Sequence, residues 1–354
     1  MSKITTYPTM DINEVKEAIK AIGTTNTIMI LSEPGCGKTS ILRMLEQEMG
    51  DGYDYIYVDG PNKEMMDIAA SIPNHATKSL EYYVSSLFKM DSGKPKVIMI
   101  DEALKVPKLL QPIYTRMYLE HTVGDRPLPE GSIVFATSNN MSDGIGDVIP
   151  AHTANRMTIV QMEKPNPKLW LSWAGERGIS PVIRAAVQMF PRMLRSYRDA
   201  DQGDNPYIFQ PSKPQVSFVS PRSLEKSDPI IRSNLDNEAK LALLAGTLGE
   251  SGARDMMTFV ALDTSVTQFE DIIDKPETVA VPTDIAPLLL MIFQALDKVE
   301  TQEQLNKYQK FINRIPNEEI QAVWFVMLFR GSKTRLARVN PEINKWALEN
   351  HNLI

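Results

Sequence analysis

The stretch "TIMILSEPGCGKTS", residues 27–40, decides how this chain is expected to fold. Its first five residues form an apolar run typical of a buried strand, and two glycines, a lysine and a threonine follow. This order matches the pattern G-x-x-x-x-G-K-[ST], in which a phosphate-binding loop joins a strand to a helix. Ser32 stands where the pattern has its first glycine. The stretch therefore predicts a strand, a phosphate-binding turn and a helix, with one departure from the pattern.

The residue types of this loop suit a bound nucleotide. Gly35 and Gly37 allow the backbone to approach phosphate oxygens in conformations that other residues resist. Lys38 would reach the β and γ phosphates, and Thr39 would place its hydroxyl on Mg²⁺. An ordinary glycine turn between a strand and a helix is the alternative. We expect the nucleotide to be bound by Pro34, Gly35, Cys36, Gly37, Lys38, Thr39 and Ser40.

Two residues of the loop are unusual for a phosphate-binding loop. Ser32 requires a backbone conformation that an L-residue accepts, so it is expected to reduce flexibility and not to abolish the site. Cys36 lies between two glycines at the start of a helix, where a thiol that solvent reaches has a lowered pKa. We expect alkylation of Cys36 to block activity and bound ATP to protect it.

A second motif is "KVIMIDEA", residues 96–103, in which Asp101 follows Lys38 by 63 residues. Four apolar residues lead into Asp101 and Glu102, and an acidic residue at the end of a parallel strand can lie beside a phosphate loop. We expect Asp101 to hold the Mg²⁺ shell and Glu102 to orient and deprotonate the attacking water. A solvated strand end is the alternative, but two such motifs in this order favour a nucleotide site.

The spacing of apolar runs predicts an α/β fold. Strands are expected at 27–31, 54–60, 97–100, 132–136 and 156–162, with crossover helices such as 38–49 and 79–90 between the first four. A first helix should begin at an Asp11–Glu14 capping box and end at Gly23. Strands that alternate with helices imply a mostly parallel sheet flanked by helices.

Beyond about residue 165 the pattern becomes helical. Two helices are expected in 167–197, more helix from 220 to about 262, a linker at 274–284, and two or three helices in 285–354. The predicted domains are therefore an α/β nucleotide-binding domain (1–165), a helical domain (166–262), and a linker with a helical C-terminal extension (263–354).

Composition narrows the classes of function. The net charge of −6 argues against a dominant nucleic-acid function, although a local basic patch or a basic pore in an oligomer stays open. A single cysteine allows no disulfide within the chain, which fits a reducing compartment. The first ten residues lack the apolar core of a signal peptide, and the apolar run 285–296 is too short to span a bilayer. We expect a cytoplasmic protein with no membrane segment.

Three segments together resemble the AAA+ ATPases, and within them the MoxR family. These are "SEPGCGKT" (32–39), "VIMIDEA" (97–103) and "GDRPLPEGSIVFATSNN" (124–140), and the resemblance extends over about residues 11–225. It implies a P-loop AAA+ core followed by an α-helical lid, which here would be residues 166–262. It also implies ATP and Mg²⁺ as cofactors.

The resemblance assigns three further residues. Asn139 looks like the sensor 1 residue that helps to place the water, and Arg222, in "VSPRSL", like the sensor 2 arginine that reaches the γ phosphate in cis. Arg156, in "ANRM", matches the arginine finger that acts on a neighbouring subunit. Asn155 and Met157 flank it where the family usually has an acidic and an aromatic residue. The alternatives are a turn asparagine for Asn139, a solvated helix start for Arg222 and a surface ion pair for Arg156.

The resemblance implies a closed ring, typically a hexamer, that uses ATP to remodel a protein partner, often a von Willebrand A-type protein. One alternative is an AAA+ nucleic-acid-binding or loading factor, against which the acidic composition counts. Another is a P-loop module that binds ATP without turnover, against which the Asp101–Glu102 pair counts.

Overall fold

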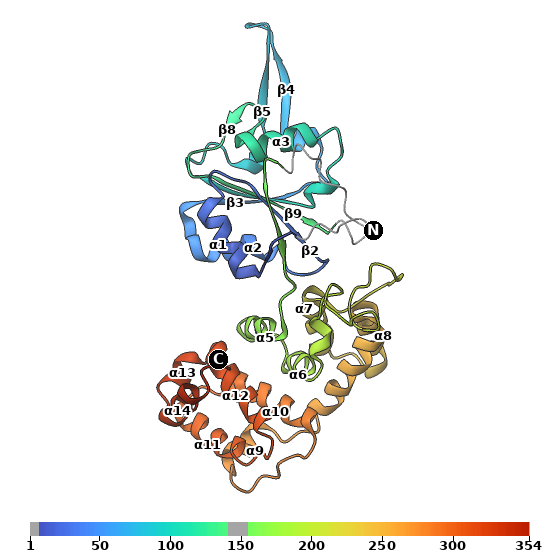
Figure 1. Ribbon diagram of the computed structural model, residues 1–354, viewed down its shortest axis with the longest axis vertical. Coiled ribbons are helices and arrows are strands. Elements are labelled where there is room, and N and C mark those ends of the chain that lie inside the picture. Colours follow the sequence, from blue (N-terminus) through green and yellow to red (C-terminus); the bar gives the residue numbers. More distant parts are fainter. Residues whose placement is uncertain (1–6, 141–154, 354) are drawn as a thin grey trace. The chain divides into compact units, whose positions relative to one another are not determined.

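The computed structural model of the chain describes residues 7–140 and 155–353. The chain divides into two compact units, residues 1–164 and 165–354. In Figure 1 the first unit runs from blue to green and the second from green to red.

The first unit is built on a six-stranded parallel sheet. In sheet order, the strands are β1 (Thr9–Met10), β10 (Thr158–Met162), β2 (Ile28–Ser32), β9 (Ile133–Asn139), β6 (Lys96–Asp101) and β3 (Asp54–Asp59). Every neighbouring pair is parallel. All residues of β2, β6 and β9 are buried, which is why these strands read as continuous apolar runs. The predicted α/β fold is confirmed.

Helices cover both faces of this sheet (Figure 1). Helices α1 (Ile12–Ile22) and α2 (Ser40–Met49) pack in one apolar cluster, and α3 (Gln111–Glu120) packs in another. Successive residues of β2 alternate between the two clusters, as the period of a strand requires. Helix α1 begins at the predicted capping box, in which Asp11 accepts from the Glu14 N–H at 2.9 Å.

The helix predicted at 79–90 is wrong. Strands β4 (Ala69–Asn74) and β5 (Ser79–Val84) form an antiparallel hairpin, and only the short 3-10 turn η3 (Ser86–Phe88) follows. The Asn74 side chain accepts from the Ala76 N–H at 2.9 Å, which favours a turn. The β5 segment "SLEYYV" is rich in aromatic residues, which favour strands. The hairpin projects from the unit (Figure 1), and a second small hairpin joins β7 (Thr122–Val123) to β8 (Arg126–Pro127).

The second unit is helical. Its helices are α5 (Pro167–Glu176), α6 (Pro181–Met189), α7 (Pro221–Arg232), α8 (Asn237–Asp263), α9 (Phe269–Asp274), α10 (Ile285–Lys298), α11 (Gln302–Ile312), α12 (Glu318–Arg330), α13 (Thr334–Arg338) and α14 (Pro341–Glu349). The sequence predicts two or three helices after residue 285. The described residues form five there, α10 to α14. Gly331 ends α12, and Asn340 caps α14 with Pro341 at its first position, so this stretch divides into short helices.

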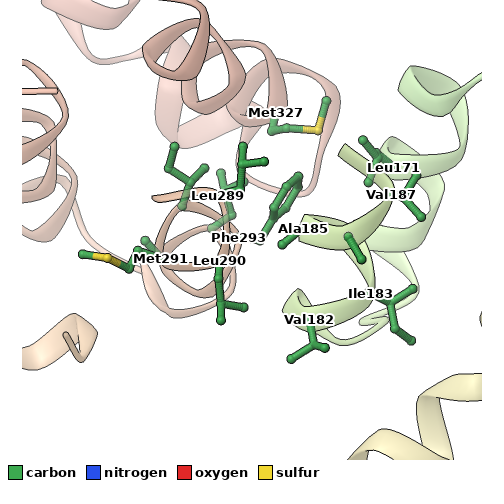
Figure 2. Packing of buried hydrophobic residues seen from close by; sticks show 14 of the residues in the cluster. Leu171, Val182, Ile183, Ala185, Val187, Leu289, Leu290, Met291, Phe293 and Met327 are labelled. Atoms are coloured by element: carbon green, nitrogen blue, oxygen red, sulfur yellow. The ribbon is translucent and has the colours of Figure 1, made fainter. Parts of the chain in front are cut away.

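One apolar cluster joins the helices of this unit. Figure 2 shows Ala185 of α6 next to Phe293 of α10, and Val182 and Ile183 belong to the same cluster. The cluster includes residues from both of the predicted segments 166–262 and 263–354. Among the described residues, no helix is long and apolar enough to cross a membrane.

Candidate nucleotide site

The loop between β2 and α2 has the conformation that its glycines allow. Gly35 and Gly37 have φ angles of 75° and 95°, in the left-handed region that favours glycine. The Ser40 hydroxyl donates to the Gly37 carbonyl at 2.6 Å and holds the last turn of the loop. Ser32 is the last residue of β2 and pairs with Asn139 in the sheet. Its strand conformation suits any L-residue, so this position does not require glycine.

Lys38 and Asn139 lie together although 101 residues separate them. The Lys38 side chain is 7% exposed, and its Nζ donates to Asn139 Oδ1 at 2.8 Å and to Ser32 Oγ at 3.0 Å. The Glu33 carbonyl accepts from the same nitrogen at 3.3 Å. Because β2 and β9 are parallel neighbours, their carboxyl ends bring the phosphate loop to the predicted sensor residue.

Asp101 ends β6, the neighbour of β9 on its other side, and is buried. Its Oδ1 accepts from the Thr137 hydroxyl and, at 3.0 Å, from the Glu102 N–H. Its Oδ2 accepts from the Tyr57 hydroxyl at 3.0 Å. Burial and the nearby Asp101 carboxylate raise the pKa of Tyr57, so its hydroxyl keeps the proton that it donates. These contacts fix the orientation of the carboxylate.

Sequence reasoning missed Thr137 and Tyr57. Thr137 precedes Asn139 by two residues and therefore lies on the same face of β9. Tyr57 lies on β3, which pairs with β6 next to Asp101. The alternation of strand residues was a usable signal for Thr137, whereas Tyr57 required knowledge of the strand order.

Glu102 leaves the strand in the left-handed region, at φ 51°. Few residues other than glycine adopt this conformation, and it is found at functional sites more often than elsewhere. The Glu102 carboxylate pairs with Lys105 Nζ at 2.5 Å. The predicted base is therefore held by a lysine three residues further along the chain.

The oxygen atoms present suit Mg²⁺, which prefers carboxylate and hydroxyl ligands completed by phosphate and water. Asp101 supplies a buried carboxylate, and Thr39 supplies an exposed hydroxyl that makes no capping hydrogen bond to α2. Within residues 7–140 and 155–353, no group of three or more His, Cys, Asp or Glu could hold a metal ion. An ion held by Asp101 and Thr39 would thus complete its shell with nucleotide oxygens and water.

The two predicted arginines belong to different units. Arg156 is exposed in the turn before β10, and because Thr158 pairs with Ile28, it lies at the amino ends of the strands. The phosphate loop lies at their carboxyl ends. Arg222 is exposed in the first turn of α7 and belongs to the second unit. The first unit therefore brings together Lys38, Asp101 and Asn139, but not Arg156.

The premise that solvent reaches the Cys36 thiol is wrong. Cys36 is 2% exposed and packs in the apolar cluster under the loop with residues of α1 and α2. Its side chain anchors the loop to the core, which leaves only its backbone N–H for a phosphate. Alkylation of the folded protein at this residue is therefore not expected.

Residues 28–145 match the model of the family described as "ATPase family associated with various cellular activities (AAA)". This segment contains the loop, Asp101, Glu102 and Asn139. It confirms the expected AAA ATPase domain with its nucleotide binding, and the protein is an ATPase. A comparison with curated protein sequences gives no match.

Several solved structures are similar to the chain, with low sequence identity and low TM-scores. A candidate ATPase from Cytophaga hutchinsonii has 14% identity and a TM-score of 0.31, over 95% of this chain and 88% of that one. A RuvB variant from Thermotoga maritima has 14% identity and a TM-score of 0.37, over 86% and 85%. NtrX from Brucella abortus, in complex with ADP, has 13% identity and a TM-score of 0.38, over 94% and 68%. At these TM-scores the similarities carry no argument about function.

Proposed function

We propose that the protein is a ring-forming ATPase of MoxR type that uses Mg²⁺-dependent ATP hydrolysis to remodel a protein partner. The observation that carries this proposal is the joint position of Lys38, Asn139 and Asp101 at the carboxyl ends of three adjacent strands. The phosphate loop and the start of α2 lie at the same edge. An ATP phosphate chain at this edge would meet a cation, a polar amide and a carboxylate.

Each part of the loop has a role in this proposal. The backbone N–H groups of residues 35–40 surround the phosphates, and Pro34 limits the loop to conformations near φ −65°. Lys38 exchanges its bonds to Ser32 and Asn139 for bonds to phosphate oxygens. Thr39 and Asp101 hold Mg²⁺, which neutralises charge on the phosphates when bound.

Hydrolysis also requires a base and a water. Glu102 accepts the proton of the attacking water after its carboxylate leaves Lys105. Asn139 orients that water through the amide that now binds Lys38. Arg222, in the proposed lid 166–262, reaches the γ phosphate from α7. Residues 263–354 extend the lid.

The position of Arg156 supports a ring. An exposed arginine at the amino ends of the strands is on the wrong side of its own sheet to reach its own phosphate loop. A neighbouring subunit could receive it as an arginine finger, which a closed hexamer supplies at every interface.

The β4–β5 hairpin supports a protein client. We propose a von Willebrand A-type protein as the client and the cytoplasm as the compartment. Leu80 and Tyr83 are 66% and 60% exposed, and Ile72 and Tyr82 are also exposed. Solvent-exposed apolar and aromatic side chains on a projecting ribbon are typical of surfaces that contact polypeptides.

A nucleic-acid-binding or loading factor is the second candidate. Arg335 and Arg338 are exposed one helical turn apart on α13, and neither makes an ion pair within the part of the chain that the structure describes. In a chain with a net charge of −6, such a basic surface favours a phosphate backbone. DNA binding that weakens steeply with salt and is lost in Arg335→Ala would support this candidate, and its absence at low salt would exclude it.

Mixed rings test the main proposal. Glu102→Gln should bind ATP but hydrolyse it at least about a hundredfold more slowly, because the base is lost. Arg156→Ala should also be slow. Mixing the two variants should restore part of the turnover, since some interfaces then combine an intact Glu102 with an intact Arg156 from the neighbour.

Arg116→Ala is the matched control, because Arg116 is an exposed arginine of the same unit that pairs with Glu120 on α3. It should turn over ATP like the wild type. Mixed assembly, verified by two affinity tags, without any recovered turnover would contradict the role of Arg156 in trans. Undiminished turnover in Glu102→Gln would contradict the role of Glu102.

A further inference from the structure

Among the described residues, three hydrogen bonds reach the Asp101 carboxylate. Its Oδ1 accepts from the Thr137 hydroxyl and from the Glu102 N–H, and its Oδ2 accepts from the Tyr57 hydroxyl. A carboxylate has about four acceptor positions, divided equally between its two oxygens. These bonds fill both positions of Oδ1 and one position of Oδ2. The position that is left for a ligand is therefore on Oδ2, the oxygen that Tyr57 holds.

The donors to the two oxygens differ in their surroundings. Thr137 lies in the buried strand β9 and is 0% exposed, and the other donor to Oδ1 is a backbone group. Tyr57 lies on β3, the edge strand of the sheet, and is 41% exposed. Asp101 is 8% exposed, so its side chain is not fully closed to an ion or a water. Buried donors thus hold Oδ1, and a side chain at the exposed edge of the sheet holds Oδ2.

Strand β3 has a second tyrosine with a different acceptor. Tyr55 and Tyr57 are two residues apart, so they lie on the same face of the strand. The Tyr55 hydroxyl donates to the Gly50 carbonyl at 2.8 Å. Gly50 follows the carboxyl end of α2, whereas the phosphate loop precedes the amino end of that helix. The two hydroxyls are chemically alike, but only that of Tyr57 lies at the candidate nucleotide site.

We propose that Tyr57 positions Asp101 for Mg²⁺. Its hydrogen bond fixes Oδ2 so that the remaining acceptor position meets Mg²⁺ or a water of the Mg²⁺ shell. This inference rests on the proposed function, because it takes Asp101 as a Mg²⁺ ligand. Tyr57 acts through Asp101 and is a positioning residue, not a catalytic one. Loss of a group that orients a metal ligand typically weakens metal affinity by about 10- to 100-fold.

A tyrosine suits this role because its hydroxyl donates without carrying a charge. The Asp101 carboxylate therefore keeps its negative charge for a cation. A lysine donor would neutralise that charge and compete with Mg²⁺, as the pair between Glu102 and Lys105 illustrates two residues away on the chain. The neutral donor at Asp101 is thus consistent with a metal ligand.

Tyr57→Phe tests this proposal because it removes only the hydroxyl. Titration calorimetry with the non-hydrolysable ATP analogue AMP-PNP, on the full chain in Mg²⁺ and in EDTA, gives the factor by which Mg²⁺ tightens binding. That factor should fall at least about tenfold in Tyr57→Phe. The affinity in EDTA should stay within about twofold of the wild type. A merely structural role would change the urea denaturation midpoint and leave the Mg²⁺ factor unchanged.

Two further variants make the test specific. Tyr55→Phe is the matched control and should keep the wild-type Mg²⁺ factor. In an Asp101→Asn background, Tyr57→Phe should have no further effect on the factor, since the two residues act as one unit.

The outcomes separate this inference from the proposed function. An unchanged factor in Tyr57→Phe, or an equal loss in Tyr55→Phe, would overturn the role of Tyr57 and leave the proposed function intact. Equal binding of AMP-PNP by the wild type in Mg²⁺ and in EDTA would contradict the proposed Mg²⁺ dependence itself, and this inference with it.

Discussion

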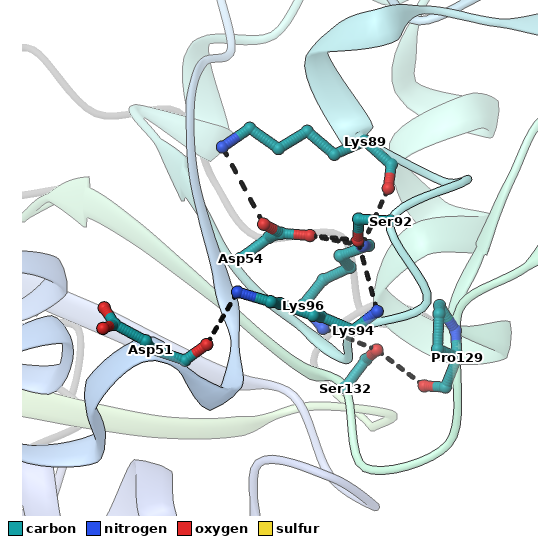
Figure 3. Close-up of polar contacts among 8 residues, drawn as sticks. All are labelled: Asp51, Asp54, Lys89, Ser92, Lys94, Lys96, Pro129 and Ser132. Atoms are coloured by element: carbon teal, nitrogen blue, oxygen red, sulfur yellow. Dashed lines mark hydrogen bonds and ion pairs between the residues drawn. The ribbon is translucent and has the colours of Figure 1, made fainter.

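Two buried lysines at opposite ends of the sheet have different partners. Lys96, the first residue of β6, is 0% exposed, and its Nζ donates to Asp54 Oδ2 and Ser92 Oγ at 2.6 Å and to the Lys89 carbonyl at 2.8 Å (Figure 3). Lys38 donates to hydroxyl, amide and carbonyl oxygens at the carboxyl ends of the strands. A carboxylate thus accepts from Lys96, and a hydroxyl, an amide and a carbonyl oxygen are among the acceptors that surround Lys38.

The hydrogen-bond partners of the two lysines indicate that Lys96 has a structural role. A buried ammonium is tolerated when it is paired and hydrogen bonded, and Asp54 satisfies this need within the chain. Hydrogen bonds from Lys96 and Ser92 hold the pKa of Asp54 below its usual range. Neutral oxygens around Lys38 can be replaced by phosphate oxygens with a gain in charge pairing. Lys96 therefore stabilises the sheet, and we propose that Lys38 exchanges its neutral acceptors for phosphate oxygens.

The largest expected effect is on nucleotide binding. Lys38→Ala should lower kcat/KM for ATP at least about a hundredfold, because it removes the cation that meets the phosphates. Its free energy of unfolding should fall by less than that of Asp54→Asn, because the alanine variant no longer buries an ammonium group. Turnover and urea denaturation measure the two quantities. A large loss of stability with normal turnover would reverse the comparison.

The second prediction concerns the opposite end of the sheet. Asp54→Asn should lower the free energy of unfolding by about 3–5 kcal/mol, because it leaves a buried ammonium without its carboxylate. The KM for ATP should stay within about twofold of the wild type. Asp51→Asn is the matched control, because Asp51 accepts from Lys94 through its backbone carbonyl. Equal stability of the two variants would show that the Lys96 pair contributes little.

The pH dependence of stability is a further test of the Lys96–Asp54 ion pair. Because the pKa of folded Asp54 lies below its ordinary value of 3.8, the pair stabilises the protein above that pH. This contribution is lost as the pH falls through the folded pKa. The stability difference between wild type and Asp54→Asn should therefore be constant from about pH 5 to 7 and shrink below about pH 4. A difference that grows in acid would contradict the ion-pair explanation.

The smallest expected effect concerns the serine in place of the first glycine. Ser32→Ala should tighten ATP binding by about two- to fivefold, because one hydrogen bond no longer holds Lys38 in the absence of nucleotide. Ser138→Ala is the matched control, since the Ser138 hydroxyl is buried nearby and has no hydrogen-bond partner among the described residues. Weaker ATP binding in Ser32→Ala would show that the serine supports the bound state.

Local patterns predicted much of the fold. The five apolar runs became β2, β3, β6, β9 and β10. Of these, β2, β6 and β9 are buried along their whole length, and such parallel strands must be apolar on both faces. The Asp11 capping box also formed as predicted. The β4–β5 hairpin was missed because its exposed ribbon has no continuous apolar run, and its position between two sheet strands suggested a crossover helix. The segment therefore followed its local β propensity and turn chemistry.

The sequence by itself determined the phosphate loop, the acidic strand end and the AAA ATPase domain, since each depends on residues that are close together in the chain. Only the tertiary structure decided which distant groups meet. The strand order brought Asn139 to Lys38 and brought Tyr57 and Thr137 to Asp101. Packing turned Cys36 into the core. These contacts depend on the order and register of elements that are far apart in sequence, which no local pattern specifies.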